Sequence, residues 1–157
     1  MENVVIDDID RRIIGRLQQD GRISHRDLGA MVGLSPNATG ARVNRLLETG
    51  VITGIHAHVN HEALGRGLEA YVDCWLESRD LGQWDRFTDH VTSDPRIIDA
   101  VHLTGKVDYR LRVVVASAAE LDDLLGKLRS EAGIGETDTR LILRSYPAQG
   151  APSPGTR

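Results

Sequence analysis

The stretch RISHRDLGAMVGLSPNATGARVNRLLETGVI, residues 22–52, decides the fold of the N-terminal part of the chain. It holds two short amphipathic helical patterns joined by a tight turn at Gly33, which supplies a left-handed turn residue. Ser24 is expected to cap the first helix, with Asp27 at the reciprocal capping-box position. Ser35 is expected to cap the second helix, and the proline directly after it fits the first helical position.

A further helix is predicted before this stretch, because apolar residues recur at helical spacing after an aspartate that can act as N-cap. Asp7 or Asp8 is the expected cap, and Asp20-Gly21 is the expected end. Three short helices with a tight turn between the last two indicate a helix-turn-helix unit, whose last helix enters the major groove of DNA. The predicted DNA contacts are Arg26, Ser35, Asn37, Ala38, Thr39, Ala41, Arg42, Asn44 and Arg45.

Arg42 and Arg45 lie on or beside the small, polar face of the third helix, and an arginine there can donate to guanine O6 and N7 or neutralise a phosphate. The alternative is a solvated helix face. Capping alone is sufficient to explain Ser35, and Thr39 points partly inward, where packing could explain it. Gly40 costs on the order of 1 kcal/mol relative to alanine in a helix, and it could permit close packing against the second helix.

Charge is distributed unevenly along the chain. The net charge is -4, but residues 1–60 contain seven arginines and seven acids, so the acidic excess belongs to the second half. Residues 22–45 contain four arginines against one acid, and this local +3 favours phosphate binding because salt screens charges beyond roughly 10 Å. No run approaches the roughly 18 apolar residues of a membrane span. We expect a cytoplasmic protein with no membrane partner.

The pattern changes after residue 67 to alternating strands and helices. Strands are predicted at 68–77, 96–104, 108–116 and 137–146. One helix is predicted through Leu81, Trp84, Phe87 and Val91, and another begins at the capping box formed by Ser117 and Glu120. The order is βαββαβ, a ferredoxin-like arrangement, so the fold class is α+β. The predicted division is a (winged) helix-turn-helix domain at 1–52, a connecting strand or hinge at 53–66, a ferredoxin-like effector-binding and oligomerisation domain at 67–146, and a disordered tail at 147–157.

This order of domains resembles the Lrp/AsnC family of transcription regulators, also called feast/famine regulators. The resemblance covers about residues 6–146. It is carried by IDDIDRRIIGRLQQDGRIS, LGAMVGLSP, RVNRLLETGVITG and HLTGKVDYRLRVVV, which occur in the correct order and spacing. It implies a sequence-specific regulator that binds pseudo-palindromic double-stranded DNA. It also implies a homodimer formed through the sheet of the second domain, with further assembly to tetramers or octamers, and a small effector, commonly an amino acid, bound between dimers.

The loop between the middle strands departs from the family pattern. It is GKVDY, where the family usually has Gly-Asp-Tyr/Phe-Asp-Tyr, so Lys106 replaces a common carboxylate and Val107 a common aromatic residue. A bound amino acid needs a carboxylate for its ammonium and donors for its own carboxylate. Asp108 is the candidate for the first role, and Lys106 or the amides near Gly105 for the second. The alternative is a glycine hairpin with a solvated lysine. The predicted effector residues are Thr104, Gly105, Lys106, Val107, Asp108, Tyr109, Thr137, Asp138 and Thr139.

Three other functions are weighed against this hypothesis. Proteins similar to this family, the sirohaem decarboxylases, act on a tetrapyrrole, and His102, Arg110 and Arg112 could hold its propionates; the basic third helix argues against this enzyme. The spacing of His56, His58 and His61 suggests a metal, but no carboxylate or thiolate completes the set. Cys74, the single cysteine, alternates with apolar residues and is expected to be a core thiol. We therefore predict no catalytic residue, no metal and no cofactor apart from an amino-acid effector.

Overall fold

The computed structural model describes residues 5–78 and 81–145. The chain divides into two compact units, one within residues 1–58 and the other at Val59–Ser145. None of the helices within the described ranges is long and apolar enough to cross a bilayer.

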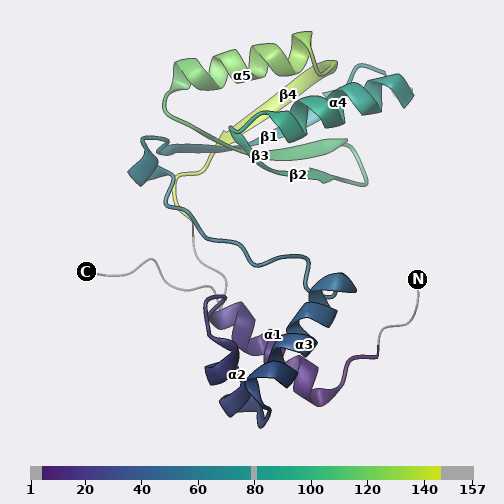
Figure 1. The fold of residues 1–157 in the computed structure, drawn as a ribbon. Helices are drawn as coiled ribbons and strands as arrows, with labels where there is room; N and C mark the ends of the chain where they lie inside the picture. The colour runs from purple at the N-terminus through teal and green to yellow at the C-terminus, as the bar shows by residue number, and fades with distance from the viewer. Residues whose placement is uncertain (1–4, 79–80, 146–157) are drawn as a thin grey trace. The chain divides into compact units, whose positions relative to one another are not determined.

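The first unit is a bundle of three short helices (Figure 1). They are α1 at Asp8–Gln19, α2 at His25–Val32 and α3 at Pro36–Glu48. Each begins at a side-chain cap predicted from the sequence: Asp7, Ser24 and Ser35 accept hydrogen bonds from backbone amides of the first helical turns. The apolar sides of the helices meet in one small core. Its buried members are Ile13, Leu28, Val32, Val43 and Leu46.

The turn between α2 and α3 depends on two glycines. Gly33 has φ 79°, a left-handed conformation that glycine adopts without strain, so α2 ends there as predicted. Gly29 allows a close approach, because a Cβ at this position would lie 2.7 Å from the carbonyl oxygen of Leu34 and 2.8 Å from Oγ1 of Thr39. A Cβ at Gly40 would lie 3.0 Å from Nδ1 of His25, so this glycine does allow close packing of α3 against α2.

The connector does not form the predicted strand, which leaves the hinge alternative. Residues 53–60 have no regular secondary structure, and a short 3-10 helix follows at Glu62–Leu64. The connecting strand and the strands of a wing are therefore absent from this part of the described chain. An extended segment becomes a β-strand only when a neighbour satisfies its backbone groups, and no neighbouring strand of this chain is paired with it.

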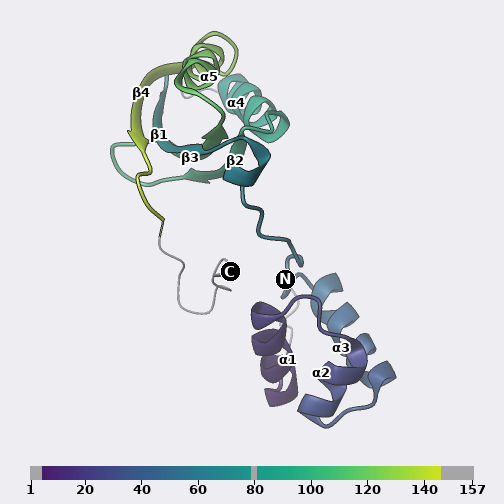
Figure 2. The same cartoon turned by 90° about the vertical axis from the view of Figure 1, so that its left-hand side faces the viewer.

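The second unit is a four-stranded antiparallel sheet with two helices on one face (Figure 2). The strand order β2-β3-β1-β4 is that of the predicted ferredoxin-like fold. The bounds are β1 Leu68–Leu76, α4 Leu81–Ser93, β2 Ile97–His102, β3 Tyr109–Val115, α5 Ala118–Ser130 and β4 Ile134–Leu141. Alternate residues of β1 and β3 point toward the helices and form the core with Phe87, Leu124 and Leu128.

The last strand begins and ends earlier than predicted. It was expected at 137–146, but β4 pairs with β1 from Ile134 to Leu141, with an irregularity in register between Trp75 and Leu76. The two glycines at 133 and 135 indicate a turn in the sequence. The free edge of β1 nevertheless offers hydrogen bonds to this segment, and the buried Ile134 packs into the core.

Candidate DNA-binding surface and effector loop

The third helix presents one uncovered face to solvent. Four of its exposed residues recur at i, i+4, i+7 and i+11, which places them on one line along the helix. We call this line the exposed stripe; it consists of Asn37, Ala41, Asn44 and Glu48. The opposite side is buried through Thr39, Val43 and Leu46. The stripe carries two amides, a methyl group and one carboxylate, so its own chemistry is polar rather than basic.

Thr39, one of the predicted DNA contacts, is buried in the structure. Its side chain is 0% exposed, and its hydroxyl donates to the carbonyl of Ser35 at 2.9 Å. Because Gly29 packs directly against it, this threonine is a core residue that fixes the angle between α2 and α3. The neighbouring Ser35 is exposed, and its hydroxyl accepts from the amide of Ala38 at 3.2 Å.

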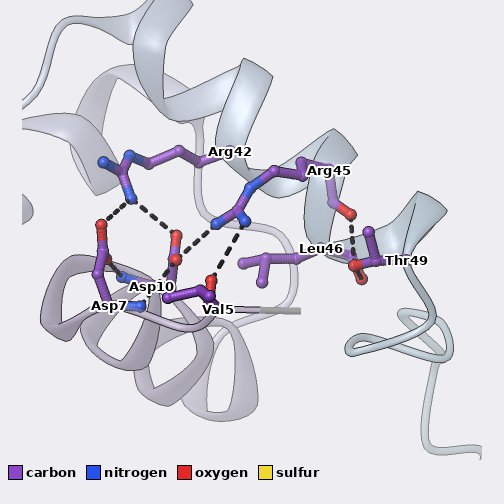
Figure 3. Close-up of polar contacts among 7 residues, drawn as sticks. All are labelled: Val5, Asp7, Asp10, Arg42, Arg45, Leu46 and Thr49. Carbon is purple, nitrogen blue, oxygen red and sulfur yellow. Dashed lines mark hydrogen bonds and ion pairs between the residues drawn. The ribbon is translucent and has the colours of Figure 1, made fainter. Parts of the chain in front are cut away.

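Arg42 and Arg45 extend from α3 toward the start of α1 rather than into open solvent (Figure 3). Arg42 Nη1 lies 2.6 Å from Oδ2 of Asp7 and 2.9 Å from Oδ1 of Asp10. Arg45 Nη2 lies 2.6 Å from Oδ2 of Asp10. We call Asp7 and Asp10 the acid pair. Arg42 and Arg45 are half-buried, so their ion pairs flank the exposed stripe on one side. Ala38 is also half-buried.

The acid pair is built from the capping box of α1. Asp7 accepts from the amide of Asp10 at 2.8 Å, and Asp10 accepts from the amide of Asp7 at 3.2 Å. The side chain of Asp10 is 1% exposed. Burial alone would raise the pKa of Asp10, but hydrogen bonds from Arg45, the Asp7 amide and Arg42 outweigh it and hold this pKa below its usual value. Two carboxylates therefore remain ionised against two guanidinium groups.

The sequence pattern does not predict these ion pairs. The local charge of +3 belongs to residues 22–45, whereas the acid pair that neutralises Arg42 and Arg45 lies before this stretch. The sequence predicts only an N-cap role for Asp7 and no role for Asp10, because capping is what local sequence can show. Five other arginines of this unit form no ion pair with the described residues. They are Arg11, Arg12, Arg16, Arg22 and Arg26, of which only the last was predicted to contact DNA.

The predicted effector loop is a compact hairpin tied to β1. The amide of Leu103 donates to the carbonyl of Asp108 at 2.9 Å, and Gly105 adopts φ 110° in the turn. Asp108 Oδ2 accepts from the amide of Leu76 at 3.1 Å, so this carboxylate helps to anchor the loop. The indole of Trp75 donates to the carbonyl of Lys106. The side chains of Thr104 and Lys106 are exposed, whereas Val107 is half-buried.

Tyr109 lies in the core rather than on the surface of the loop. It is 8% exposed, and its ring centroid lies 4.1 Å from that of Phe87 and 4.7 Å from that of His102. Burial raises the pKa of its phenol. The strand alternation directs its ring toward α4, so in the single chain it serves the core, and an effector contact by this tyrosine stays a prediction.

The loop and the start of β4 lie at the same end of the sheet. Cys74 of β1 is paired with Tyr109 on one side and with Thr137 on the other. Thr139 lies on the same face as Thr137, and Asp138 lies on the opposite face. Arg129 donates to Oγ1 of Thr137 at 3.3 Å, and Arg140 binds Asp138. Strand β1 therefore separates the two groups of predicted effector residues.

The residues of the alternative hypotheses are engaged in the fold. Arg110 donates to both carboxylate oxygens of Asp73, and Arg112 Nη2 lies 2.8 Å from Glu69. His102 stacks on Tyr109. Among residues 5–78 and 81–145, no group of three histidine, cysteine or acidic side chains could hold a metal ion. Burial raises the pKa of the Cys74 thiol to about 12, so it remains a protonated core group.

Both units match known protein families. Residues 6–47 match the AsnC-type helix-turn-helix domain, and residues 69–152 match the Lrp/AsnC ligand binding domain. The chain belongs to the Lrp/AsnC family. The regulator AldR of Mycolicibacterium smegmatis is 35% identical over 138 residues, covering 87% of this chain and 81% of AldR. The Bkd operon transcriptional regulator of Pseudomonas aeruginosa is 34% identical over 148 residues, covering 94% and 97%.

Solved structures agree with this membership of the Lrp/AsnC family. A feast or famine regulatory protein of M. tuberculosis, complexed with L-methionine, has a TM-score of 0.82 and 33% identity, covering 92% of this chain and 97% of that one. The leucine response regulatory protein of M. tuberculosis has a TM-score of 0.80 and 34% identity, covering 90% and 95%. This Lrp/AsnC chain is a DNA-binding transcription regulator and not an enzyme; the decarboxylase hypothesis finds no support among these relatives.

Proposed function

We propose that this regulator recognises its target sequence through the exposed stripe of α3 and the residues beside it. The observation that supports this most directly is the pattern of exposure: Asn37, Ala41 and Asn44 are uncovered on one line of a helix that follows a tight turn. An asparagine amide can bind adenine N6 and N7 bidentately, and an alanine methyl can contact the methyl group of thymine. The helix would lie in the major groove with this line toward the base edges.

Phosphate contacts would come from the surrounding groups. Ser35 and Ala38 lie at the N-terminal turn of α3, where backbone amides and the helix dipole favour an anion. Arg26 is an exposed arginine of α2 and would bind the backbone beside the groove. Arg42 and Arg45 lie on the flank of the stripe. Their remaining N–H groups would reach the same strand from the other side, since each guanidinium has donors that the acid pair does not use.

The second domain would assemble the regulator. The helices cover one face of its sheet, and the other face carries the exposed apolar residues Tyr71 and Val101 beside the ion pairs of Arg110 and Arg112. A second copy of the chain on this face would form a homodimer, with further assembly to tetramers or octamers. Two α3 helices related by a two-fold axis would bind pseudo-palindromic double-stranded DNA with half-sites about one helical turn apart.

The effector would be an amino acid, bound at the loop 104–108 and the start of β4. Support comes from the matching ligand binding domain and from the L-methionine complex of a relative. The loop offers an exposed Lys106 that can bind a carboxylate. Because β1 lies between the loop and Thr137, a complete site would need these groups from neighbouring copies. Effector binding would bias one assembly and change DNA affinity by a coupling of typically about 1–3 kcal/mol.

The test is selection of duplexes from a random-sequence pool by the purified full chain, followed by anisotropy titration of the selected duplex. We expect a pseudo-palindromic consensus whose affinity exceeds that of random DNA by at least about a thousandfold. Twenty amino acids added singly should include one that shifts the affinity. Enrichment of no sequence at all would contradict the proposal of base-specific recognition.

A further inference from the structure

The acid pair occupies the arginines that flank the exposed stripe. Both oxygens of Asp10 are taken by α3, one by Arg42 at 2.9 Å and the other by Arg45 at 2.6 Å. Asp7 takes Arg42 Nη1 as well, at 2.6 Å. These contacts exceed what a helix cap requires, since the capping box needs only the two backbone amides of α1.

This cluster lies next to the surface that would face DNA. A depression of about 440 Å³ is lined by both acids and both arginines, and also by Ala41 of the exposed stripe. Arg45 directly follows Asn44, so it lies about 100° around the helix from the stripe. A DNA phosphate on this flank would therefore approach the same guanidinium groups that the acid pair holds.

A carboxylate and a phosphate compete for the same donors. The carboxylate is planar and the phosphate is tetrahedral, but each is an oxyanion that accepts paired N–H hydrogen bonds from a guanidinium group. The side chain of Asp7 is 48% exposed, so its bond with Arg42 can be exchanged for a bond with an incoming anion. Asp10 is enclosed, so it would keep its hold on Arg45 and orient that side chain.

We propose that Asp7 and Asp10 compete with DNA phosphate for Arg42 and Arg45. By restraining these two arginines, the acid pair weakens binding to DNA that lacks the target sequence. This inference rests on the proposed DNA-binding surface. The free energy of nonspecific binding comes from phosphate contacts, whereas the polar stripe contributes only when the bases match. Restraining two flanking arginines therefore removes a larger share of the nonspecific binding free energy than of the specific one. The acid pair would set how tightly the regulator holds DNA that lacks its target, without itself contacting a base.

The test compares Asp7→Asn with Asp8→Asn in the full chain. Asparagine caps a helix as well as aspartate does, so Asp7→Asn keeps the fold of α1. Asp8 is exposed in the same helical turn and forms no ion pair with the described residues, so its replacement makes the same change of net charge without releasing an arginine. The measurement is anisotropy binding to a random-sequence duplex across a tenfold range of salt concentration.

We expect the plot of log affinity against log salt to steepen by about 0.9 for Asp7→Asn, the value for one additional phosphate contact, and to keep its wild-type slope for Asp8→Asn. A tenfold decrease in salt would then give Asp7→Asn about an eightfold extra gain in affinity. Asp10→Asn should steepen the slope further if circular dichroism shows it folded. Equal slopes for the Asp7 and Asp8 variants would overturn the inference. Failure of the wild type to prefer its selected duplex would instead overturn the proposed function.

Discussion

Gly29 offers the sharpest test of how α2 and α3 fit together, because its replacement by alanine involves two opposing and calculable effects. A methyl group at this position would lie 2.7 Å from the carbonyl oxygen of Leu34 and 2.8 Å from Oγ1 of Thr39, closer than real Cβ atoms approach other atoms. The Leu34 oxygen belongs to the backbone of the turn, so the turn itself must move. Overpacking of this kind costs about 1–3 kcal/mol, and a backbone clash lies at the upper end.

Alanine also has a higher helix propensity than glycine, which stabilises the Gly29→Ala variant by about 1 kcal/mol. The net result is a loss of about 2 kcal/mol in the free energy of unfolding, or a fall of about 10 °C in the melting temperature of the first domain. Gly15→Ala is the matched control. It lies in the interior of α1 with no atom within 4 Å of its Cβ position, so only the favourable effect applies. Its melting temperature should rise by about 5 °C.

Thermal unfolding of the full chain, followed by far-ultraviolet circular dichroism, measures both variants. Because both domains contain helices, the transition of the first domain is the one whose midpoint the two substitutions should shift. The reasoning requires the two substitutions to have opposite signs. A Gly29→Ala variant as stable as the wild type would refute the close approach of α2 to the turn. An equal fall for Gly15→Ala would show that alanine destabilises these helices for another reason.

Three further predictions concern the second domain. The hydrogen bond from Arg110 is the main cause that lowers the pKa of Asp73 in the folded protein. The ionised Asp73 therefore stabilises the fold above pH 3.8, the pKa of the unfolded chain, and this stabilisation is lost as the pH falls through the lower pKa of the folded state. Denaturant titrations over this pH range should show that the free energy of unfolding falls less with acid in Asp73→Asn than in the wild type. Leu124→Ala removes a fully buried core side chain and should lower the free energy of unfolding by about 2–5 kcal/mol, measured in urea. Cys74, with its pKa raised to about 12, should resist alkylation at neutral pH in the native protein and react in denaturant, as followed by mass spectrometry.

The parts of the structure that the sequence predicted are those that local chemistry determines. Ser24, Ser35 and Ser117 each cap a helix in the predicted place, because a cap depends on the first turn of its own helix. The turn at Gly33 follows from the need for a positive φ. The order of strands and helices in the second domain followed from periodicity and from the family pattern.

The parts that the sequence missed depend on contacts between distant segments. Asp10 and Arg45 are 35 residues apart, and their ion pair arises only because α1 and α3 cross at this point. The helical pattern of α3 leaves Thr39 between core and surface, and its packing against Gly29 of α2 places it in the core. Strand β4 begins early because β1 offers hydrogen bonds to this segment. The glycines on either side of Ile134 indicate a turn in the sequence, so local preference does not predict this pairing. Each miss is a case in which tertiary contacts outweigh local preference.

The central claim is that the exposed stripe of α3 recognises bases. The most direct measurement is the ratio of affinities for the selected duplex and for random DNA, at one salt concentration, in the double variant Asn37→Ala/Asn44→Ala and in Gln18→Ala as a surface control on α1. Each bidentate base contact contributes about 1–3 kcal/mol of discrimination, so the double variant should lose at least about thirtyfold of this ratio while its affinity for random DNA is unchanged. An unchanged ratio in the double variant would contradict the claim.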